Sequence, residues 1–400
     1  MSESQTVAVL EWGTSKIKVL IAELVDGKKL NIISKSNVDT LMSIKKGDII
    51  DVAKTYGKTR DAIASAESKG SVKIKSVSLA ISGTHIKTFR NLGSATISSS
   101  DGLVRREDVE RAKEDAKRKI LENGRCYIQK ICCGYYLDGK FCLDPVGRPA
   151  SKIDAEYLMV HGDNGRIVEM SNIIRSAGLE FDDIILSGIA SAIAVSSPRQ
   201  KMEGVFVADI GAGTTDYACI KNGKVILAGI LPVGGNHITN DIAVGLRVAA
   251  RTAESVKVKC GKLSPAEEEK SKVYWAIGDK QIGDKKILGD SINKIVLARV
   301  CEILEILREE AAELLADNAI GEIVLTGGAA NTDGICDLAA KIFARPCSKG
   351  RFPSELPPHL RVQSWATPIG VLEHVRMREQ KKSVQKSGLF GTLKNMFFQQ

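Results

Sequence analysis

One stretch of this sequence combines an acid, hydroxyl groups and glycines in a spacing suited to phosphate and metal chemistry. An apolar run at residues 205–208 ends at Asp209, and the turn that follows contains Gly211, Gly213, Thr214 and Thr215. Glycines let a backbone approach a ligand closely and present several N–H groups to it, an arrangement that suits a phosphate. A carboxylate at the strand end could face a hydrated Mg2+, which prefers oxygen ligands and keeps several waters. The stretch therefore favours a magnesium–phosphate site over an ordinary glycine-rich hairpin.

A second stretch, near the N-terminus, has the same order of residues. An apolar run at residues 7–10 leads to Glu11, and the turn after it contains Gly13, Thr14 and Ser15. The two acids are 209 − 11 = 198 residues apart, so the chain looks like two related halves. Two such turns facing each other across a cleft could hold one polyphosphate from both sides.

Both motifs are expected to lie between strands, at residues 7–10 and 17–24 in the first and at residues 205–208 and 217–220 in the second. In the second, Asn222-Gly223 leads into a further strand, and Asn-Gly between apolar runs is a strong hairpin signal. A third glycine turn, Gly327-Gly328, ends a strand predicted from residue 322 and precedes a predicted helix. It is weak evidence alone, but as the third part of one cleft it would offer backbone N–H groups to a nucleotide.

The remaining elements are expected to complete two α/β halves. Helices are predicted at residues 49–67, 105–121, 172–177, 188–195, 239–244, 253–259, 292–316 and 335–344, with strands at 72–81 and 183–186. Residues 262–290 are polar and rich in turns. Between about residues 85 and 162 the repeat is lost, which indicates an inserted subdomain. The small residues at 188–195 predict a helix crossing between the halves, either as a buried linker or as a hinge.

The composition bounds the class of protein. The chain has 400 residues, 44% hydrophobic and 26% charged, which is typical of a soluble protein with more than one domain. No signal peptide is visible, and no segment approaches the ~20 apolar residues of a spanning helix. Nine cysteines without a secretory signal indicate a reducing cytosol. The spacing of four of them fits no zinc pattern and favours strand or core residues over a metal or redox role: Cys126, Cys132, Cys133 and Cys142.

The C-terminal tail predicts an attachment to membranes. Residues 376–386 form a linker with five basic residues and one acid, and residues 376–400 carry six basic residues and one acid, +5 of the total +9. At ~100° per residue, five apolar side chains beyond the linker fall within about 120° of one another: Leu389, Phe390, Leu393, Met396 and Phe397. A short helix of this kind behind a basic segment is typical of an interfacial anchor on anionic lipid. Docking of the tail on its own domain is the alternative. Nucleic acid is not an expected partner, because the charge is concentrated in the tail.

These motifs resemble those of the actin and Hsp70-type ATPase superfamily. Along nearly the whole chain the sequence resembles the bacterial FtsA family, on stretches such as WGTSKIKVLIAE, PVGRPASKIDAE, VADIGAGTTDYA, LPVGGNHITNDIAVGL and VLTGGAANTDGI. The resemblance implies an α/β fold of duplicated ribonuclease-H-type domains around a nucleotide cleft, with an inserted FtsA-type α+β subdomain. The implied divisions are 1–84 (subdomain 1A), 85–163 (inserted subdomain 1C), 164–200 (return of 1A and crossing helix), 201–236 (2A), 237–300 (2B), 301–375 (return of 2A and closing helix), 376–386 (linker) and 387–400 (amphipathic helix).

The resemblance also implies ATP and Mg2+ as ligands and assigns roles to matching residues. The phosphates would be held by Gly13, Thr14, Ser15, Gly211, Gly213, Thr214 and Thr215. Glu11 and Asp209 would face the metal through water, as candidate metal- and water-positioning acids. The nucleotide would be lined by Gly234, Gly235 and Asn236, and the adenosine would pack on Gly327, Gly328 and Ala329. Glu254 and Lys257 could form a mere exposed ion pair one helical turn apart, but they match the positions at which the family contacts ribose and adenine.

Three departures from the superfamily pattern predict at most slow ATP hydrolysis. Glu11 replaces the usual Asp, as in some FtsA proteins, and Trp12 replaces a small aliphatic residue. The crossing segment SGIASA, residues 187–192, lacks the acid that hydrolytic relatives use there.

The resemblance implies a function in cell division. A member of this family would self-assemble at the division site and tether filaments of FtsZ to the cytoplasmic face of the inner membrane as a peripheral protein, with downstream division proteins as further partners. Two alternatives stay open. A PilM-like adaptor of another membrane assembly would not need the amphipathic tail, and a sugar-kinase-type phosphotransferase would need a catalytic Asp and a sugar pocket in the first domain.

Overall fold

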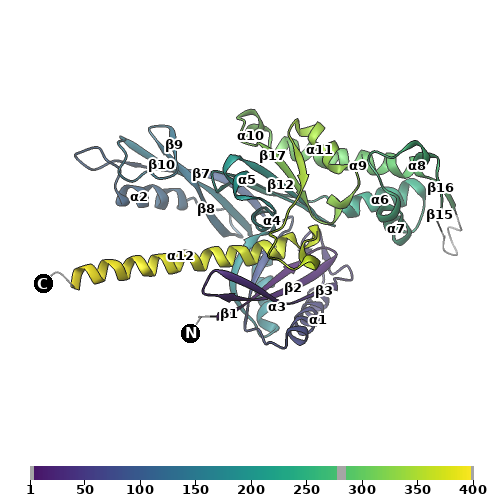
Figure 1. Ribbon diagram of the computed structural model, residues 1–400, viewed down its shortest axis with the longest axis horizontal. Helices are drawn as coiled ribbons and strands as arrows, with labels where there is room; N and C mark the ends of the chain where they lie inside the picture. Colours follow the sequence, from purple (N-terminus) through teal and green to yellow (C-terminus); the bar gives the residue numbers. More distant parts are fainter. Residues whose placement is uncertain (1–3, 277–284, 398–400) are drawn as a thin grey trace.

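The computed structural model describes the backbone of residues 4–276 and 285–397 and the side chains of residues 4–275 and 286–381. Two five-stranded sheets form the frames of the two halves (Figure 1). The first sheet has the order β11-β6-β1-β2-β3, from Glu180–Leu186, Ser76–Ile81, Ser4–Trp12, Lys16–Val25 and Lys29–Asp39. The second has the order β14-β13-β12-β17-β18, from Lys224–Leu231, Thr215–Lys221, Val205–Ile210, Glu322–Thr326 and Cys347–Lys349.

The two sheets share one plan, which confirms the predicted duplication. In each, three consecutive strands form an antiparallel meander, and the first of them pairs in parallel with a strand from much later in the chain: β6 for β1 and β17 for β12. The central strands β1 and β12 are buried on both faces. A strand covered on both faces needs apolar residues at successive positions, which explains the continuous apolar run before each acid.

The predicted insertion forms its own sheet with the order β7-β10-β8-β9, from Lys87–Thr96, Lys152–Asp163, Arg125–Leu137 and Lys140–Cys142. Helix α2 (Arg106–Lys117) packs on this sheet, and a separate small core lies between them. In Figure 1 the insertion projects from one end of the molecule. The four clustered cysteines lie on β8 and β9, and Cys133 and Cys142 are buried in cores.

The helices surround the two frames. The first half carries α1 (Val52–Gly70), α3 (Asn164–Ser176) and the two-stranded β4 (Ile44–Lys45) and β5 (Asp48–Ile49). The second carries α5 (Pro198–Glu203), α6 (Gly235–Leu246), α7 (Ala250–Cys260), α8 (Glu267–Ser271), α9 (Gly289–Glu310), α10 (Ala312–Ala316), α11 (Ile335–Phe343) and the hairpin β15 (Val273–Ala276) and β16 (Lys285–Leu288). Short 3-10 turns are η1 (Gly328–Asn331), η2 (Pro358–Leu360) and η3 (Gln363–Trp365).

The crossing helix α4 (Ser187–Val195) is almost entirely buried and packs against α12 (Ala366–Phe397). Small residues make this packing possible. A Cβ on Gly188 would lie 2.8 Å from the backbone of Tyr217 in the second sheet, and a Cβ on Gly370 would collide with the carbonyl of Ala190. The helix predicted to cross between the halves is therefore present and buried, built from side chains small enough for two helices and a sheet to meet.

Several predicted elements differ in extent. Helix α3 begins at residue 164 instead of 172, because the Asp163 side chain accepts from the Arg166 N–H and caps it. The helix predicted at 292–316 ends with α9 and resumes as α10 after Ala311, whose ψ of 2° leaves the helical region. The turn-rich segment at 262–290 contains α8 and the β15–β16 hairpin.

The basic linker predicted at residues 376–386 is helical and starts on the body of the protein. Helix α12 runs without interruption from Ala366 to Phe397 and extends away from the two halves in Figure 1. Arg378 donates to the Asp183 carboxylate of β11 at 2.8 Å, and Arg376 binds Glu373 within the helix. The first turn of this segment is therefore held to the core by an ion pair with β11. The side chains of the five anchor residues at 389–397 lie outside the described part. No helix in the described part is long and apolar enough to cross a membrane.

Candidate functional site

The turns of the two hairpins meet. A Cβ on Gly213 would collide with the side chain of Thr14, so only glycine allows this approach between the halves. The Thr14 hydroxyl also accepts from the Gly47 N–H at 3.2 Å, and Ser82 donates to the Thr214 hydroxyl at 3.4 Å. The predicted juxtaposition of the two glycine turns is therefore present, and residues from both halves surround it.

The two turns have the same backbone hydrogen bond. The Gly13 N–H donates to the Lys16 carbonyl at 3.0 Å, and the Gly211 N–H donates to the Thr214 carbonyl at 2.9 Å. A Cβ on Gly13 would lie 2.9 Å from the Lys16 carbonyl oxygen, and a Cβ on Gly211 would lie 3.0 Å from that of Thr214. The glycine two residues after each acid is thus required by the turn itself.

Asp209 is held by hydroxyl groups from two helices, the crossing helix α4 and the helix α12 that packs against it. Its Oδ2 accepts from Ser191 of α4 at 2.5 Å and from Thr367 of α12 at 3.0 Å. Burial raises the pKa of Asp209, although these two hydrogen bonds and the Lys18 cation oppose the rise. Because Thr367 stands in the first turn of α12, this carboxylate is connected directly to the helix that leads to the tail.

Glu11 and Asp216 lie near Asp209 and interact with it electrostatically; Asp216 is buried, whereas Glu11 and Asp209 are half-buried. Glu11 accepts from Lys18 at 2.9 Å, and burial raises the pKa of Glu11 despite this cation. Asp216 accepts from the Thr214 hydroxyl at 3.0 Å, while its Oδ1 is buried without a hydrogen-bond partner. Burial, with the charges of Asp209 and Glu11, raises the pKa of Asp216 to about 7.

Sequence reasoning missed Asp216, Ser191, Thr367 and Lys18. The register of the second hairpin pairs Asp209 with Asp216, and that of the first pairs Glu11 with Lys18. Residues that pair across a hairpin share one face of the sheet. The hairpin signal itself could therefore have found Lys18 and Asp216, seven residues after each acid.

The second half supplies a loop and two helices beside these turns. The Gly235 and Asn236 N–H groups donate to the carbonyls of Gly211 and Ala212, at 2.9 and 2.8 Å. The Lys257 ammonium donates to the Gly235 carbonyl at 3.1 Å and to the Thr239 hydroxyl at 2.8 Å.

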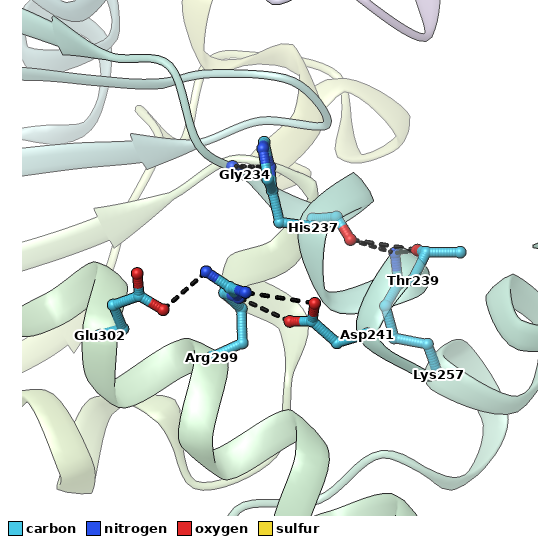
Figure 2. Close-up of polar contacts among 8 residues, drawn as sticks. Gly234, His237, Thr239, Asp241, Lys257, Arg299 and Glu302 are labelled. Atoms are coloured by element: carbon cyan, nitrogen blue, oxygen red, sulfur yellow. Dashed lines mark hydrogen bonds and ion pairs between the residues drawn. The ribbon is translucent and has the colours of Figure 1, made fainter. Parts of the chain in front are cut away.

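Glu254 and Lys257 form the expected ion pair at 2.6 Å, and Glu254 also accepts from Thr239. The pair therefore fastens the start of α6 to α7 as well as being an i, i+3 contact. Figure 2 shows this region, with Lys257 and Thr239 directed toward the first turn of α6.

A neighbouring network that the sequence did not indicate joins α6 to α9. Arg299 binds both oxygens of Asp241, at 2.6 and 3.2 Å, and also Glu302 at 2.6 Å (Figure 2). The His237 Nδ1 accepts from the Gly234 N–H at 3.1 Å, which holds the loop before α6. These contacts hold α6, which begins with the predicted nucleotide-lining residues Gly235 and Asn236, against α9.

The third glycine turn packs closely against Asp209. Gly327 has φ +87°, and a Cβ there would collide with the Asp209 carboxylate and lie 2.5 Å from the Ile210 carbonyl. Gly328 has no neighbour within 4 Å of its Cβ position, so its surface is open to a ligand. Ala329 approaches the predicted loop, at 3.7 Å from the Cβ position of Gly235.

One predicted phosphate residue has another commitment. Thr215 is fully buried and donates its hydroxyl to the Val233 carbonyl at 2.8 Å. Ser15 is exposed, and only its backbone carbonyl is engaged, by the Thr40 N–H at 3.1 Å. In the described part of the chain no three His, Cys, Asp or Glu side chains are grouped closely enough to ligate a metal directly. The partnerless Asp216 oxygen and the neighbouring charges of Asp209 and Glu11 form an acidic site whose chemistry suits a cation faced through water.

The fold and site define an actin-like protein: two duplicated α/β domains whose glycine turns meet beside three neighbouring acids. Among solved structures, the PilM-PilN type IV pilus biogenesis complex matches with a TM-score of 0.64 at 15% identity, over 93% of this chain and 98% of that one. MreB5 of Spiroplasma citri bound to ADP matches with a TM-score of 0.54 at 15% identity, over 95% and 98%.

More particularly, the chain belongs to the FtsA family of cell-division proteins. The family model "Cell division protein FtsA" matches residues 206–370, and that of the SHS2 domain inserted in FtsA matches residues 83–161. The cell division protein FtsA of Neisseria meningitidis serogroup B is 30% identical over 376 residues, which are 92% of this chain and 90% of that protein. These matches confirm the predicted family and fold.

Proposed function

We propose that this protein binds ATP with Mg2+ between its two halves, self-assembles at the division site, and tethers FtsZ filaments to the cytoplasmic face of the inner membrane. The observation that carries the nucleotide part is the meeting of the Thr14 and Gly213 turns beside three neighbouring carboxyl groups, one buried and two half-buried. Membership of the FtsA family supports the role in division. Downstream division proteins are further partners in this proposal.

The predicted residues have distinct parts in holding the nucleotide. The phosphates would lie against the turns at residues 13–15 and 211–215, and the adenosine against the loop at 234–236, Glu254, Lys257 and the turn at 327–329. Bound Mg2+ would supply positive charge that offsets both the phosphates and the carboxylates. Asp209 and Glu11 would each face it through water, with Asp209 oriented by its two hydroxyl donors.

Turnover is expected to be slow. The crossing helix α4 offers a serine where hydrolytic relatives use an acid, and the Ser191 hydroxyl is already hydrogen-bonded to Asp209. No side chain of this segment can accept a proton from an attacking water. Phosphate release by the isolated protein should fall far below the median enzyme turnover of ~10 per second. A rate near that median would favour an enzyme instead.

The tail would attach the protein to the membrane through residues 389–397. Burying a large apolar side chain contributes ~1.5–3 kcal/mol, but ordering a residue costs ~1–2 kcal/mol. The terms are comparable for five such side chains on a short helix, so one tail should bind reversibly. Self-assembly would place many tails on one surface and convert weak binding into stable attachment.

Co-sedimentation with anionic liposomes tests this proposal. The full chain with Mg2+ and ATP should carry FtsZ into the liposome pellet. Phe390→Glu should abolish sedimentation of both proteins, because it places a charge at the acyl boundary, and its ATP binding should be unchanged. The matched control Asn395→Glu adds the same charge on the other side of the predicted helix and should still sediment.

Three results would contradict the proposal. Sedimentation without FtsZ would favour an adaptor of another membrane assembly. Equal sedimentation of the Phe390→Glu variant, or of a chain truncated after Gln385, would exclude the tail as the anchor.

A further inference from the structure

The inserted subdomain contacts both halves of the protein, although it is covalently part of the first. Strand β7, by which the chain enters the insertion, lies beside β14, the edge strand of the second sheet. The Thr88 hydroxyl donates to the Ala228 carbonyl at 2.6 Å, and the Arg90 Nε donates to the Ile226 carbonyl at 3.2 Å. These two hydrogen bonds, which we call the latch, join alternate residues of β7 and β14. The insertion therefore spans the boundary between the halves.

The insertion is attached to the first half through a network around Asp48 of β5. Its Oδ1 forms an ion pair with Arg166 at 2.8 Å, and its Oδ2 accepts from the Thr84 hydroxyl. Thr84 precedes β7, and Arg166 stands in the first turn of α3, directly after β10, so Asp48 holds the segments that lead into and out of the insertion. The His85 Nδ1 accepts from the Asp163 N–H at 3.3 Å and ties these segments to each other.

This network begins beside the phosphate turns. The Gly47 N–H, one residue before the carboxylate of the network, donates to the Thr14 hydroxyl at 3.2 Å. The Ser82 hydroxyl, two residues before the threonine of the network, donates to the Thr214 hydroxyl at 3.4 Å. The two threonine hydroxyls that would meet a phosphate are therefore hydrogen-bonded to the segments that position the insertion.

Nucleotide binding at the proposed site must change how the two halves lie relative to each other. A Cβ on Gly213 would collide with the Thr14 side chain, so even a methyl group does not fit between the two turns at this separation. A phosphate held between them must therefore move them apart. The insertion then cannot keep both attachments unchanged, because one is on each half.

We propose that the latch opens when ATP binds, so that the insertion moves with the first half and separates from β14. This inference rests on the proposed binding of ATP between the halves. The latch is the attachment that breaks, because it consists of two hydrogen bonds to backbone carbonyls, whereas the Asp48 network contains a charge-assisted pair. The coupling is reciprocal, so any change that weakens the latch should tighten ATP binding.

Hydrogen–deuterium exchange of the full wild-type chain, measured by mass spectrometry, tests the opening without any variant. Calorimetry first establishes the concentrations of Mg2+ and ATP that saturate the protein. At saturation, the β14 amides of residues 224–231 should exchange about tenfold faster, because the edge of the second sheet loses its cover. Strand β9, which pairs with β8 inside the insertion, should exchange at an unchanged rate.

A double variant, Thr88→Val with Arg90→Leu, removes both donors of the latch. Its ATP affinity by calorimetry should be about tenfold higher than that of the wild type, because binding no longer breaks two hydrogen bonds. Thr88→Val alone keeps the ion pair between Arg90 and Glu156 and should give a smaller gain in the same direction. The matched control Arg118→Leu removes an exposed arginine of the insertion that lies 3.9 Å from Glu114, and it should bind ATP like the wild type.

The outcomes separate this inference from the proposed function. If ATP binds but leaves exchange at residues 224–231 unchanged, or if the wild type and the double variant bind ATP equally well, the latch does not respond to nucleotide and the proposed function stands. If the wild type binds no ATP, both are wrong.

Discussion

The two hairpins of this protein have the same backbone and different charge. Each begins with a buried strand that ends in an acid, and in each the glycine two residues later donates to a carbonyl three residues beyond it. The residue seven positions after the acid pairs with it across the hairpin. In the first hairpin this residue is Lys18, and in the second it is Asp216.

The difference decides where charge is left unbalanced. Burial raises the pKa of Glu11 too, but this acid has its own cation, Lys18, at 2.9 Å within the hairpin. Asp209 faces a second carboxyl group, and the pKa of Asp216 rises to about 7 because burial and the neighbouring acids disfavour its charge. The second hairpin must therefore take up a proton or a cation, whereas the first need not.

The duplication thus preserves the backbone that suits phosphate and varies the side chains that suit a metal. We infer that the second hairpin is where Mg2+ would enter, with the hydroxyl groups of Ser191 and Thr367 orienting Asp209 from the crossing helices. Changes confined to one hairpin should therefore have unequal effects.

The largest effect is expected from Gly327→Ala, which breaks the contact between the third turn and the second hairpin. Its methyl group would collide with the Asp209 carboxylate at a φ of +87°, which strains any residue other than glycine. ATP binding measured by calorimetry should become undetectable. The matched control is Gly57→Ala in α1, which has no neighbour within 4 Å of its Cβ position and should bind normally. Normal binding by the Gly327 variant would contradict the packing argument.

A smaller effect is expected from Asp216→Asn, which should change how the stability of the protein depends on pH. The pKa of Asp216 rises from 3.8 to about 7 on folding, so between these values the native state keeps a proton that the unfolded chain has lost. The free energy of unfolding of the nucleotide-free protein should therefore fall as pH rises toward 7, by on the order of 4 kcal/mol at most.

The asparagine variant lacks this penalty. Its melting temperature should exceed that of the wild type at pH 8 and the advantage should shrink toward pH 5. Parallel melting curves for the two proteins across this range would show that Asp216 does not carry the unbalanced charge.

The elements that the sequence predicted well are those fixed by local chemistry. Short continuous apolar runs, Asn222-Gly223 and the glycine turns specify strands and hairpins from neighbouring residues alone, and the 198-residue repeat then implies two similar sheets. The meeting of Thr14 with Gly213 follows from the same symmetry once the two halves are placed face to face.

The missed features depend on contacts between distant segments. Ser191 and Thr367 lie 18 and 158 residues from Asp209, and only the packing of α4 and α12 brings them to it. The basic segment at residues 376–386 contains no helix breaker, so its helical structure agrees with its sequence. The ion pair between Arg378 and Asp183 of β11, in contrast, has no signal in the sequence. Burial of an acid, which sets its pKa, also follows from the assembled fold and not from spacing.

Calorimetry of ATP binding with and without Mg2+ tests the central claim most directly. In the wild type we expect Mg2+ to tighten ATP binding by about tenfold or more, which is about 1.4 kcal/mol. Asp209→Ala should lose this gain, while Glu11→Gln should keep most of it, because Lys18 already balances Glu11. If Asp209→Ala retained the full gain from Mg2+, or if Glu11→Gln alone lost it, the assignment of the metal to the second hairpin would be wrong.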